Sequence, residues 1–207
     1  MTKIKICGVT TEEVLKAAAG ADFVGFVFYP KSPRALETAA ASILSAAAPP
    51  HLKKTGLFVD PDDALLERVL SQVELNMIQL HGDENPQRVR DIAARFGLPV
   101  MKALRVADES DVRKARRYEE AAKWLLFDAK VEGQAGGTGK TFDWGLLKGF
   151  KSSLPWMLSG GLNAANVGDA LAVLKPDAVD VSSGVESAPG RKDPALIENF
   201  IKTVKNR

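Results

Sequence analysis

The feature that most constrains this chain is the repetition of one structural unit. A short apolar run, typical of a buried β-strand, is followed by a turn and then by an amphipathic, helix-like stretch. Strict alternation of strands and helices predicts a parallel sheet, so the chain is predicted to be an α/β protein. Eight runs are predicted strands: Lys3–Ile6, Phe23–Phe28, Thr55–Val59, Met77–Leu80, Val100–Leu104, Trp124–Phe127, Trp156–Leu158 and Ala178–Val181.

Helical stretches follow most of these strands: Thr11–Ala19, Leu36–Ala48, Pro61–Gln72, Pro86–Phe96, Glu109–Tyr118, Asn166–Leu174 and Pro194–Val204. Capping side chains are expected just before four of these helices, at Thr11, Asp60, Glu84-Asn85 and Asp193. The sixth unit is the weakest, because a glycine-rich loop follows its strand and only Trp144–Phe150 is a candidate helix.

Eight such units in 207 residues favour a closed (βα)8 barrel, the TIM barrel, formed by residues 1–207 as a single catalytic domain with a short or irregular sixth helix. An open, doubly wound sheet is the alternative that the pattern leaves. In a barrel, catalytic groups lie where the strands end and the following loops begin. Unusual polar residues are therefore expected at the carboxyl ends of the strands.

The composition limits the partners and the compartment. The 28 Lys and Arg nearly balance the 26 Asp and Glu, and no basic stripe interleaves with aromatics, which argues against nucleic acid. The most apolar run, Phe23–Tyr29, is too short to span a membrane, and strand-like residues from Lys3 leave no room for a signal peptide. One cysteine excludes an internal disulfide and fits a reducing compartment. A cytoplasmic monomer or homodimer is expected.

Two strand ends carry a candidate acid and base. If Lys5 faces the barrel interior, its ammonium lies one step below Cys7, where a cation lowers a thiol's pKa and favours the thiolate. Asp128 ends the sixth strand, across the barrel mouth, so the two groups are placed to move protons at two atoms of one ligand. The alternatives are a small buried apolar Cys7 and an Asp128 that caps a helix or lies in a loop.

Four other polar residues are candidates for substrate binding. Gln79 and His81 share one face of the fourth strand's end, where His81 lines a pocket, orients a neighbour or is a structural histidine. Arg34 follows two prolines and suits bidentate capture of a carboxylate or phosphate, although most arginines are solvated surface charges. Asp180, within the eighth strand, bonds either loop backbone or substrate hydroxyls. Since the other histidine, His51, lies in a polar loop, no metal site is expected.

Three glycine-rich turns come late in the chain. Each is by itself an ordinary turn signal, but barrels often bind phosphate with the loops after strands seven and eight. Glycine lets backbone N–H groups approach an anion closely. The predicted phosphate-binding residues are Ser159, Gly160, Gly161, Ser182, Ser183 and Gly184, with Gly136 and Gly137 as substrate-binding residues. No GxGxxG follows the first strand, so a dinucleotide is not expected.

Ten ordered motifs are spread over nearly the whole chain: Lys5–Thr10, Val24–Phe28, Ser32–Arg34, Gly56–Val59, Gln79–Gly82, Phe127-Asp128, Gly136–Gly139, Phe142–Trp144, Leu158–Leu162 and Asp180–Glu186. Together they resemble the phosphoribosylanthranilate isomerase family of tryptophan biosynthesis. The resemblance implies an Amadori rearrangement of N-(5-phosphoribosyl)anthranilate to 1-(2-carboxyphenylamino)-1-deoxyribulose 5-phosphate. It also implies Cys7 as general base, Asp128 as general acid, Arg34 at the anthranilate carboxylate, phosphate at the last two loops, and no cofactor.

Two other functions stay open. The related isomerase of histidine biosynthesis performs the same rearrangement on a barrel, but that family uses a carboxylate pair and binds two phosphates. Here a thiol ends the first strand, and one phosphate cradle is evident. The second alternative is a non-catalytic barrel that binds a phosphometabolite and regulates a partner; intact Cys7 and Asp128 argue against it.

Overall fold

Eight parallel strands close into a barrel in a computed structural model that describes residues 1–129 and 141–207. Each strand pairs with its neighbours in the sequence, and the first pairs with the eighth. The strands are β1 Lys3–Cys7, β2 Phe23–Val27, β3 Lys53–Phe58, β4 Met77–Leu80, β5 Val100–Val106, β6 Trp124–Ala129, β7 Trp156–Leu158 and β8 Ala178–Val181. The predicted (βα)8 barrel is confirmed, and the open sheet is excluded.

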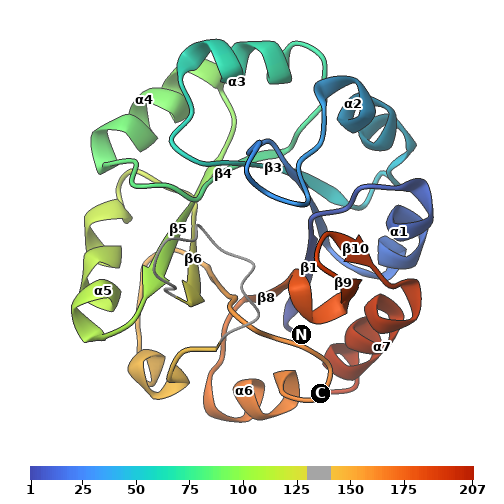
Figure 1. Cartoon of the computed structure of the whole chain (residues 1–207). Coiled ribbons are helices and arrows are strands. Elements are labelled where there is room, and N and C mark those ends of the chain that lie inside the picture. The colour runs from blue at the N-terminus through green and yellow to red at the C-terminus, as the bar shows by residue number, and fades with distance from the viewer. Residues whose placement is uncertain (130–140) are drawn as a thin grey trace.

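A ring of helices surrounds the barrel (Figure 1). They are α1 Glu12–Ala17, α2 Thr38–Ala47, α3 Asp63–Leu70, α4 Pro86–Phe96, α5 Glu109–Arg113, α6 Val167–Val173 and α7 Pro194–Lys205. Helices α1 and α5 continue as the 3₁₀ turns Ala18–Gly20 and Lys114–Tyr118. Between β6 and β7, the helical structure within the described residues is the 3₁₀ turn Trp144–Leu147, which agrees with the weak sixth unit of the sequence.

Most of the predicted helix starts are correct. The side chains of Thr11, Asn85 and Asp193 each accept a hydrogen bond from a backbone N–H of the following first turn. The prediction for Asp60 was wrong, because Asp62 caps α3. Asp60 has a left-handed φ of 45° and still belongs to the turn that leaves β3, so helical geometry begins only after Asp62.

The apolar core occupies two places. Outward-facing strand residues such as Ile4, Ile6 and Phe26 are fully buried beneath the helices. A second cluster fills the barrel interior near the starts of the strands: Phe23, Met77, Met101, Ala103, Leu126, Met157 and Ala178. Burying one large apolar side chain contributes roughly 1.5–3 kcal/mol, so these layers close one end of the barrel firmly.

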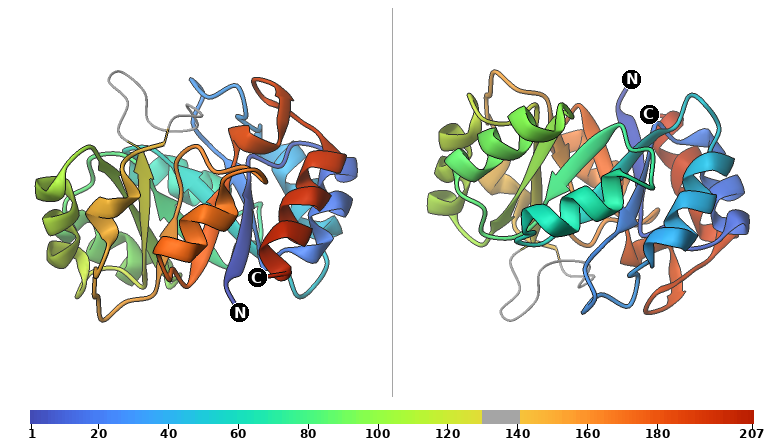
Figure 2. Two further views of the ribbon diagram at one scale, coloured as in Figure 1. Left: turned by 90° about the horizontal axis from the view of Figure 1, so that it is seen from below. Right: turned by 90° about the horizontal axis from the view of Figure 1, so that it is seen from above.

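The other end of the barrel carries the polar interior residues. Seen from the side, the loop after β2 and the hairpin after β8 lie at this end, and both termini lie toward the opposite end (Figure 2). The hairpin consists of β9 Glu186–Ala188 and β10 Arg191–Lys192. This division places the site where the strands end, as the barrel rule predicts.

Candidate active site

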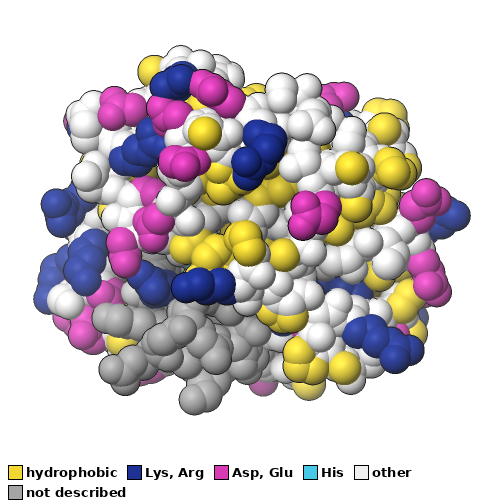
Figure 3. Space-filling model, turned by 45° about the horizontal axis from the view of Figure 1, so that its top comes forward, with side chains coloured by type: hydrophobic (Ala, Val, Ile, Leu, Met, Phe, Trp, Pro, Cys, Tyr) yellow, Lys and Arg dark blue, Asp and Glu magenta, His cyan; other side chains and the backbone are white. Residues whose placement is uncertain are grey.

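A cavity of about 740 Å³ opens at the carboxyl end of the barrel. This volume falls in the usual range for small-molecule sites. Seen at an angle, the surface shows apolar side chains near the middle, among scattered basic and acidic side chains (Figure 3). The predicted site residues that line the cavity are Cys7, Arg34, His81, Asp128, Ser159, Gly160, Gly161, Asp180, Ser182 and Ser183.

Two further predicted residues, Gln79 and Gly184, are not among those that line the cavity. Gln79 is fully buried on β4 and reaches the site through His81. Gly184 packs against the turn after β7, where an added Cβ would lie 1.9 Å from the Leu162 carbonyl oxygen. Gly136 and Gly137 lie outside the described residues.

Cys7 ends β1 and is 4% exposed, beside the apolar side chains of Val27 and Leu57. Across the β1–β2 pairing it faces Gly25, where a Cβ would lie 3.0 Å from the sulfur, so the glycine leaves room for the thiol. Burial raises the pKa of the Cys7 thiol above its ordinary value, although the charges of Lys5 and Lys192 act in the opposite direction. The predicted net lowering of the thiol pKa was wrong.

The physical reason lies in the partner of Lys5. Lys5 faces the barrel interior, as predicted, but its ammonium donates to Asp180 Oδ1 at 2.7 Å, and both side chains are buried. Burial alone would lower the pKa of Lys5, but the charge and hydrogen bond of Asp180 reverse this, so the pKa is raised and the lysine stays charged. Since Asp180 offsets that charge, the Lys5 ammonium does not overcome the burial of the thiol.

Within the described residues, the hydrogen bonds of the Asp180 carboxylate come from side chains. Its second carboxylate oxygen accepts a hydrogen bond from Ser159 Oγ at 2.9 Å. Lys5, Asp180 and Ser159 thereby form a connected polar floor from β1, β8 and β7. Sequence analysis left two alternatives open for Asp180, loop backbone and substrate hydroxyls, and did not include these side-chain partners. Lys5 meets Asp180 because β1 closes the barrel against β8 and puts the two residues side by side in register.

Asp128 is positioned from two sides. Its Oδ2 lies 3.1 Å from His81 Nε2, and its Oδ1 accepts the backbone N–H of Ala129 at 2.8 Å. His81 Nδ1 lies 3.0 Å from Gln79 Nε2. With the Gln79 amide donating to Nδ1, His81 carries its proton on Nε2 and directs it at the carboxylate. Among the roles weighed for His81, the structure supports orienting a neighbour and lining the pocket.

A charged cluster near β8 was missed by sequence reasoning. Arg34 donates from Nε and Nη2 to the two carboxylate oxygens of Glu186, at 2.7 and 2.8 Å. Lys192 donates to the same carboxylate at 2.5 Å and to Ser182 Oγ at 3.3 Å. Although burial opposes the shift, the hydrogen bonds from Arg34 and Lys192 lower the pKa of Glu186 to about 2. Burial lowers the pKa of Lys192.

Glycine residues shape the two turns that follow β7 and β8. Gly160 and Gly161 have φ of 86° and 64°, a left-handed conformation that glycine adopts without strain. Gly184 lets the second turn approach the backbone of the first, as its contact with Leu162 shows. Ser159, Gly160 and Gly161 line the cavity together with Ser182 and Ser183.

Within residues 1–129 and 141–207, no group of three or more His, Cys, Asp and Glu side chains is placed to hold a metal ion. Nor does this part of the chain contain a helix that is long and apolar enough to cross a membrane.

The fold and the cavity together define a (βα)8-barrel protein whose polar candidate site lies at the carboxyl ends of its strands. Residues 4–203 match the family model described as N-(5'phosphoribosyl)anthranilate (PRA) isomerase. The chain is 51% identical over 208 residues to the N-(5'-phosphoribosyl)anthranilate isomerase of Cereibacter sphaeroides, covering 98% of each. It therefore belongs to this family of intramolecular isomerases of tryptophan biosynthesis.

Solved structures agree with this assignment. The crystal structure of phosphoribosyl anthranilate isomerase from Thermotoga maritima superposes with a TM-score of 0.90 and 42% identity, over the full length of both chains. Another phosphoribosyl anthranilate isomerase, solved in complex with reduced 1-(o-carboxyphenylamino)-1-deoxyribulose 5-phosphate, gives a TM-score of 0.85 and 40% identity, again over both full chains. The family favours the tryptophan enzyme over the related isomerase of histidine biosynthesis.

Proposed function

We propose that this chain converts N-(5-phosphoribosyl)anthranilate to 1-(2-carboxyphenylamino)-1-deoxyribulose 5-phosphate, with Cys7 as general base and Asp128 as general acid. One observation carries the proposal: Cys7 on β1 and Asp128 on β6 line the same cavity from separate sides of the barrel mouth. An acid and a base on either side of one ligand is the arrangement that proton transfer at two atoms needs.

Asp128 acts first. It donates a proton to the furanose ring oxygen, the bond between that oxygen and the first sugar carbon breaks, and the anthranilate nitrogen's lone pair forms the iminium. The hydrogen bonds from His81 and from the Ala129 N–H hold the carboxyl group in one orientation while this happens. A fixed donor avoids reorganisation in the transition state.

Cys7 acts second. The iminium acidifies the proton on the second sugar carbon, and the thiolate removes it to leave an enolamine. The enolamine gains a proton at the first carbon and loses one from its hydroxyl, which gives the ketone, so no external oxidant or reductant is needed. Because burial raises the pKa of the Cys7 thiol, we infer that the cations Lys5 and Lys192 and the nearby iminium together favour the thiolate in the complex.

The two ends of the substrate carry negative charge, and the cavity has a matching group at each end. The backbone of the turns at Gly160-Gly161 and Ser182-Ser183 would bind the phosphate. Arg34, fixed by Glu186, would meet the anthranilate carboxylate. Gln79, His81, Asp180 and, outside the described residues, Gly136 and Gly137 complete the proposed substrate-binding set.

The test is a fluorescence assay that follows consumption of phosphoribosylanthranilate. Cys7→Ala and Asp128→Asn should each lower kcat by about 100- to 10,000-fold, the usual contribution of a general base or acid, without loss of folding. Substantial turnover by a folded Cys7→Ala protein would remove the base assignment. Turnover of the histidine-pathway substrate, but not of phosphoribosylanthranilate, would replace the proposed substrate. Sedimentation of the same protein distinguishes the predicted monomer from the homodimer.

A further inference from the structure

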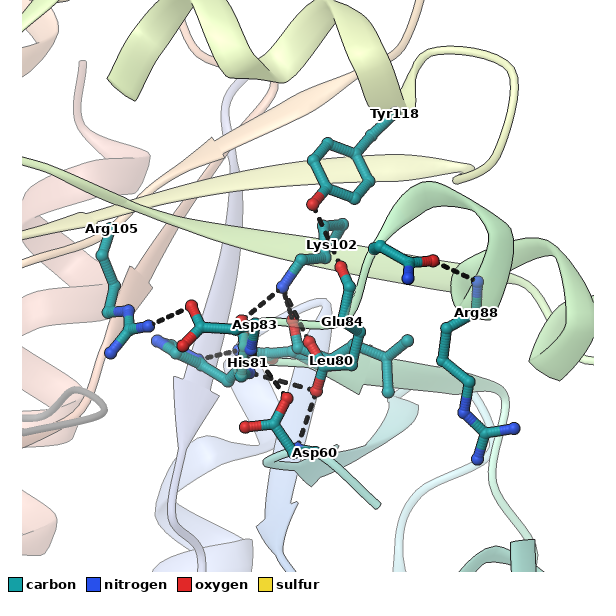
Figure 4. A network of polar contacts seen from close by, with 12 residues as sticks. Asp60, Leu80, His81, Asp83, Glu84, Arg88, Lys102, Arg105 and Tyr118 are labelled. Atoms are coloured by element: carbon teal, nitrogen blue, oxygen red, sulfur yellow. Dashed lines mark hydrogen bonds and ion pairs between the residues drawn. The ribbon is translucent and has the colours of Figure 1, made fainter. Parts of the chain in front are cut away.

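A buried ion pair lies outside the cavity, beneath the turn that follows β4. Lys102 on β5 donates from Nζ to Glu84 Oε2 at 2.7 Å, and each side chain is 2% exposed (Figure 4). Neither residue is among those that line the cavity. Burying two charges is costly unless further hydrogen bonds satisfy them, so the other partners of the pair indicate what it is for.

Those partners are the backbone groups on either side of His81. Lys102 Nζ also donates to the carbonyl of Gly82 at 2.7 Å and lies 3.4 Å from the carbonyl of Leu80. Glu84 Oε1 accepts the N–H of Gly82 at 3.1 Å. The ion pair therefore holds the backbone on both sides of His81: the Leu80 carbonyl before it, and the carbonyl and N–H of Gly82 after it. The N–H of His81 itself donates to the carbonyl of Phe58 at the end of β3.

The pair is itself braced by two neighbouring segments. Glu84 Oε1 accepts the N–H of Asp60 at 2.9 Å, and Asp60 Oδ1 accepts the N–H of Asp83 at 2.7 Å, so the turns after β3 and β4 are tied together. Tyr118 donates its hydroxyl to the Glu84 carbonyl at 3.0 Å (Figure 4). At Gly82 an added Cβ would lie 2.3 Å from Asp60 Oδ1. This turn is held in one conformation.

His81 is the residue of that turn that reaches the chemistry. Its Nε2 lies 3.1 Å from Asp128 Oδ2, and Gln79 sets the ring from the other side. A backbone shift at His81 would move the imidazole relative to the carboxyl group, and a displacement of about 1 Å in such a constellation costs on the order of 100-fold in rate.

We propose that Glu84 and Lys102 are positioning residues for the acid step: the ion pair fixes the backbone around His81 so that the imidazole holds Asp128 in its proton-donating orientation. The inference rests on the proposed role of Asp128. It adds two residues that touch neither the substrate nor the acid, and it explains why two charges are buried between the barrel and Tyr118.

The test compares this pair with a buried lysine at the opposite end of the barrel. Glu84→Gln alone, and Glu84→Gln with Lys102→Met, remove one or both charges while keeping similar volumes, so that no single charge is left buried in the double variant. Lys54→Met is the matched control: Lys54 is 8% exposed near the start of β3 and bonds Glu74 at 2.8 Å.

The expected result is a kcat about 10- to 100-fold lower in both Glu84 variants, with KM changed much less. Lys54→Met should keep kcat, even if it lowers Tm by as much as the Glu84 variants do. In a His81→Gln background the Glu84→Gln change should cost little further kcat, because no imidazole is left to place. Normal kcat in both Glu84 variants, or an equal loss with and without His81, would overturn the proposal.

A second readout does not depend on turnover. The chain has two histidines, so nitrogen-15 NMR of the imidazoles reports His81 directly, with His51→Gln to assign the other signal. The wild type should show one Nε2–H tautomer of His81, and the Glu84 variants should show exchange between tautomers; an unchanged spectrum contradicts the positioning role. If Asp128→Asn stays active, the proposed function fails; if it is inactive while Glu84→Gln turns over normally, only this inference fails.

Discussion

Glu186 gives a prediction whose size follows from the structure. Its carboxylate accepts two hydrogen bonds from Arg34 and one from Lys192, and its side chain is 3% exposed. These contacts lower its pKa from 4.5 to about 2. Because the folded pKa lies below the unfolded pKa, the resulting stability is fully present above pH 4.5 and is lost as the pH falls toward 2.

A pKa lowered from 4.5 to about 2 corresponds to about 3 kcal/mol of stability at pH 7, of which about 2 kcal/mol is lost by pH 3. Glu186→Gln removes the titrating group. The free energy of unfolding of the wild type should therefore exceed that of Glu186→Gln by an amount that shrinks by about 2 kcal/mol between pH 7 and pH 3.

Urea unfolding followed by tryptophan fluorescence at a series of pH values measures this difference. The same comparison in an Arg34→Met background is the control, because with one cation gone the pH-dependent part should become smaller. If the difference in the free energy of unfolding between wild type and Glu186→Gln stays constant from pH 7 to pH 3, the reasoning is refuted. Glu186 would then have the same pKa in the folded and the unfolded protein.

Three further predictions concern the same cavity. Alkylation of the lone Cys7 by iodoacetamide should have an apparent pKa above the free-thiol value of about 8.5, because burial raises the pKa of this thiol; a midpoint below 8 contradicts this. Lys5→Met should lower the free energy of unfolding by roughly 3–5 kcal/mol by leaving the buried Asp180 carboxylate without its cation, and adding Asp180→Asn should restore part of it in the same urea assay. Gly184→Ala should destabilise the fold by about 1–3 kcal/mol and raise KM, because its Cβ would lie 1.9 Å from the Leu162 carbonyl oxygen; unchanged KM would place the phosphate elsewhere.

The sequence pattern was sufficient to predict the architecture and to predict that most of the candidate residues described here lie at one cavity. Alternation of strand and helix predicted the barrel, and the rule that catalytic groups follow the strands brought Cys7, His81 and Asp128 to one cavity. These predictions depend only on local signals. The last residues of parallel strands lie at the same end of the barrel, whichever residues they contact.

The sequence did not predict which charged residues pair with one another. Lys5 stands beside Cys7 in the sequence, but its partner Asp180 is 175 positions away and meets it only when β1 closes on β8. Lys192 is buried because the β9–β10 hairpin folds back onto Ser182, and no periodicity marks this. Glu84 looked like a helix cap before Pro86, but Asn85 takes that role, which leaves the glutamate for Lys102.

The same pairings explain how the site holds three cations close together. Among the described residues, Lys5 pairs with Asp180, while Arg34 and Lys192 share the carboxylate of Glu186. Long basic side chains lose roughly 1.5–2 kcal/mol of conformational freedom when they are ordered. The carboxylates order them before the substrate arrives, so that loss is not repeated on binding. Cys7 gains less from this arrangement, because burial and the charge of Asp180 raise the pKa of its thiol against the charges of Lys5 and Lys192. In the proposed mechanism we therefore expect the positive charge of the iminium to complete the activation of the thiolate, so that ring opening by Asp128 precedes removal of the proton by Cys7.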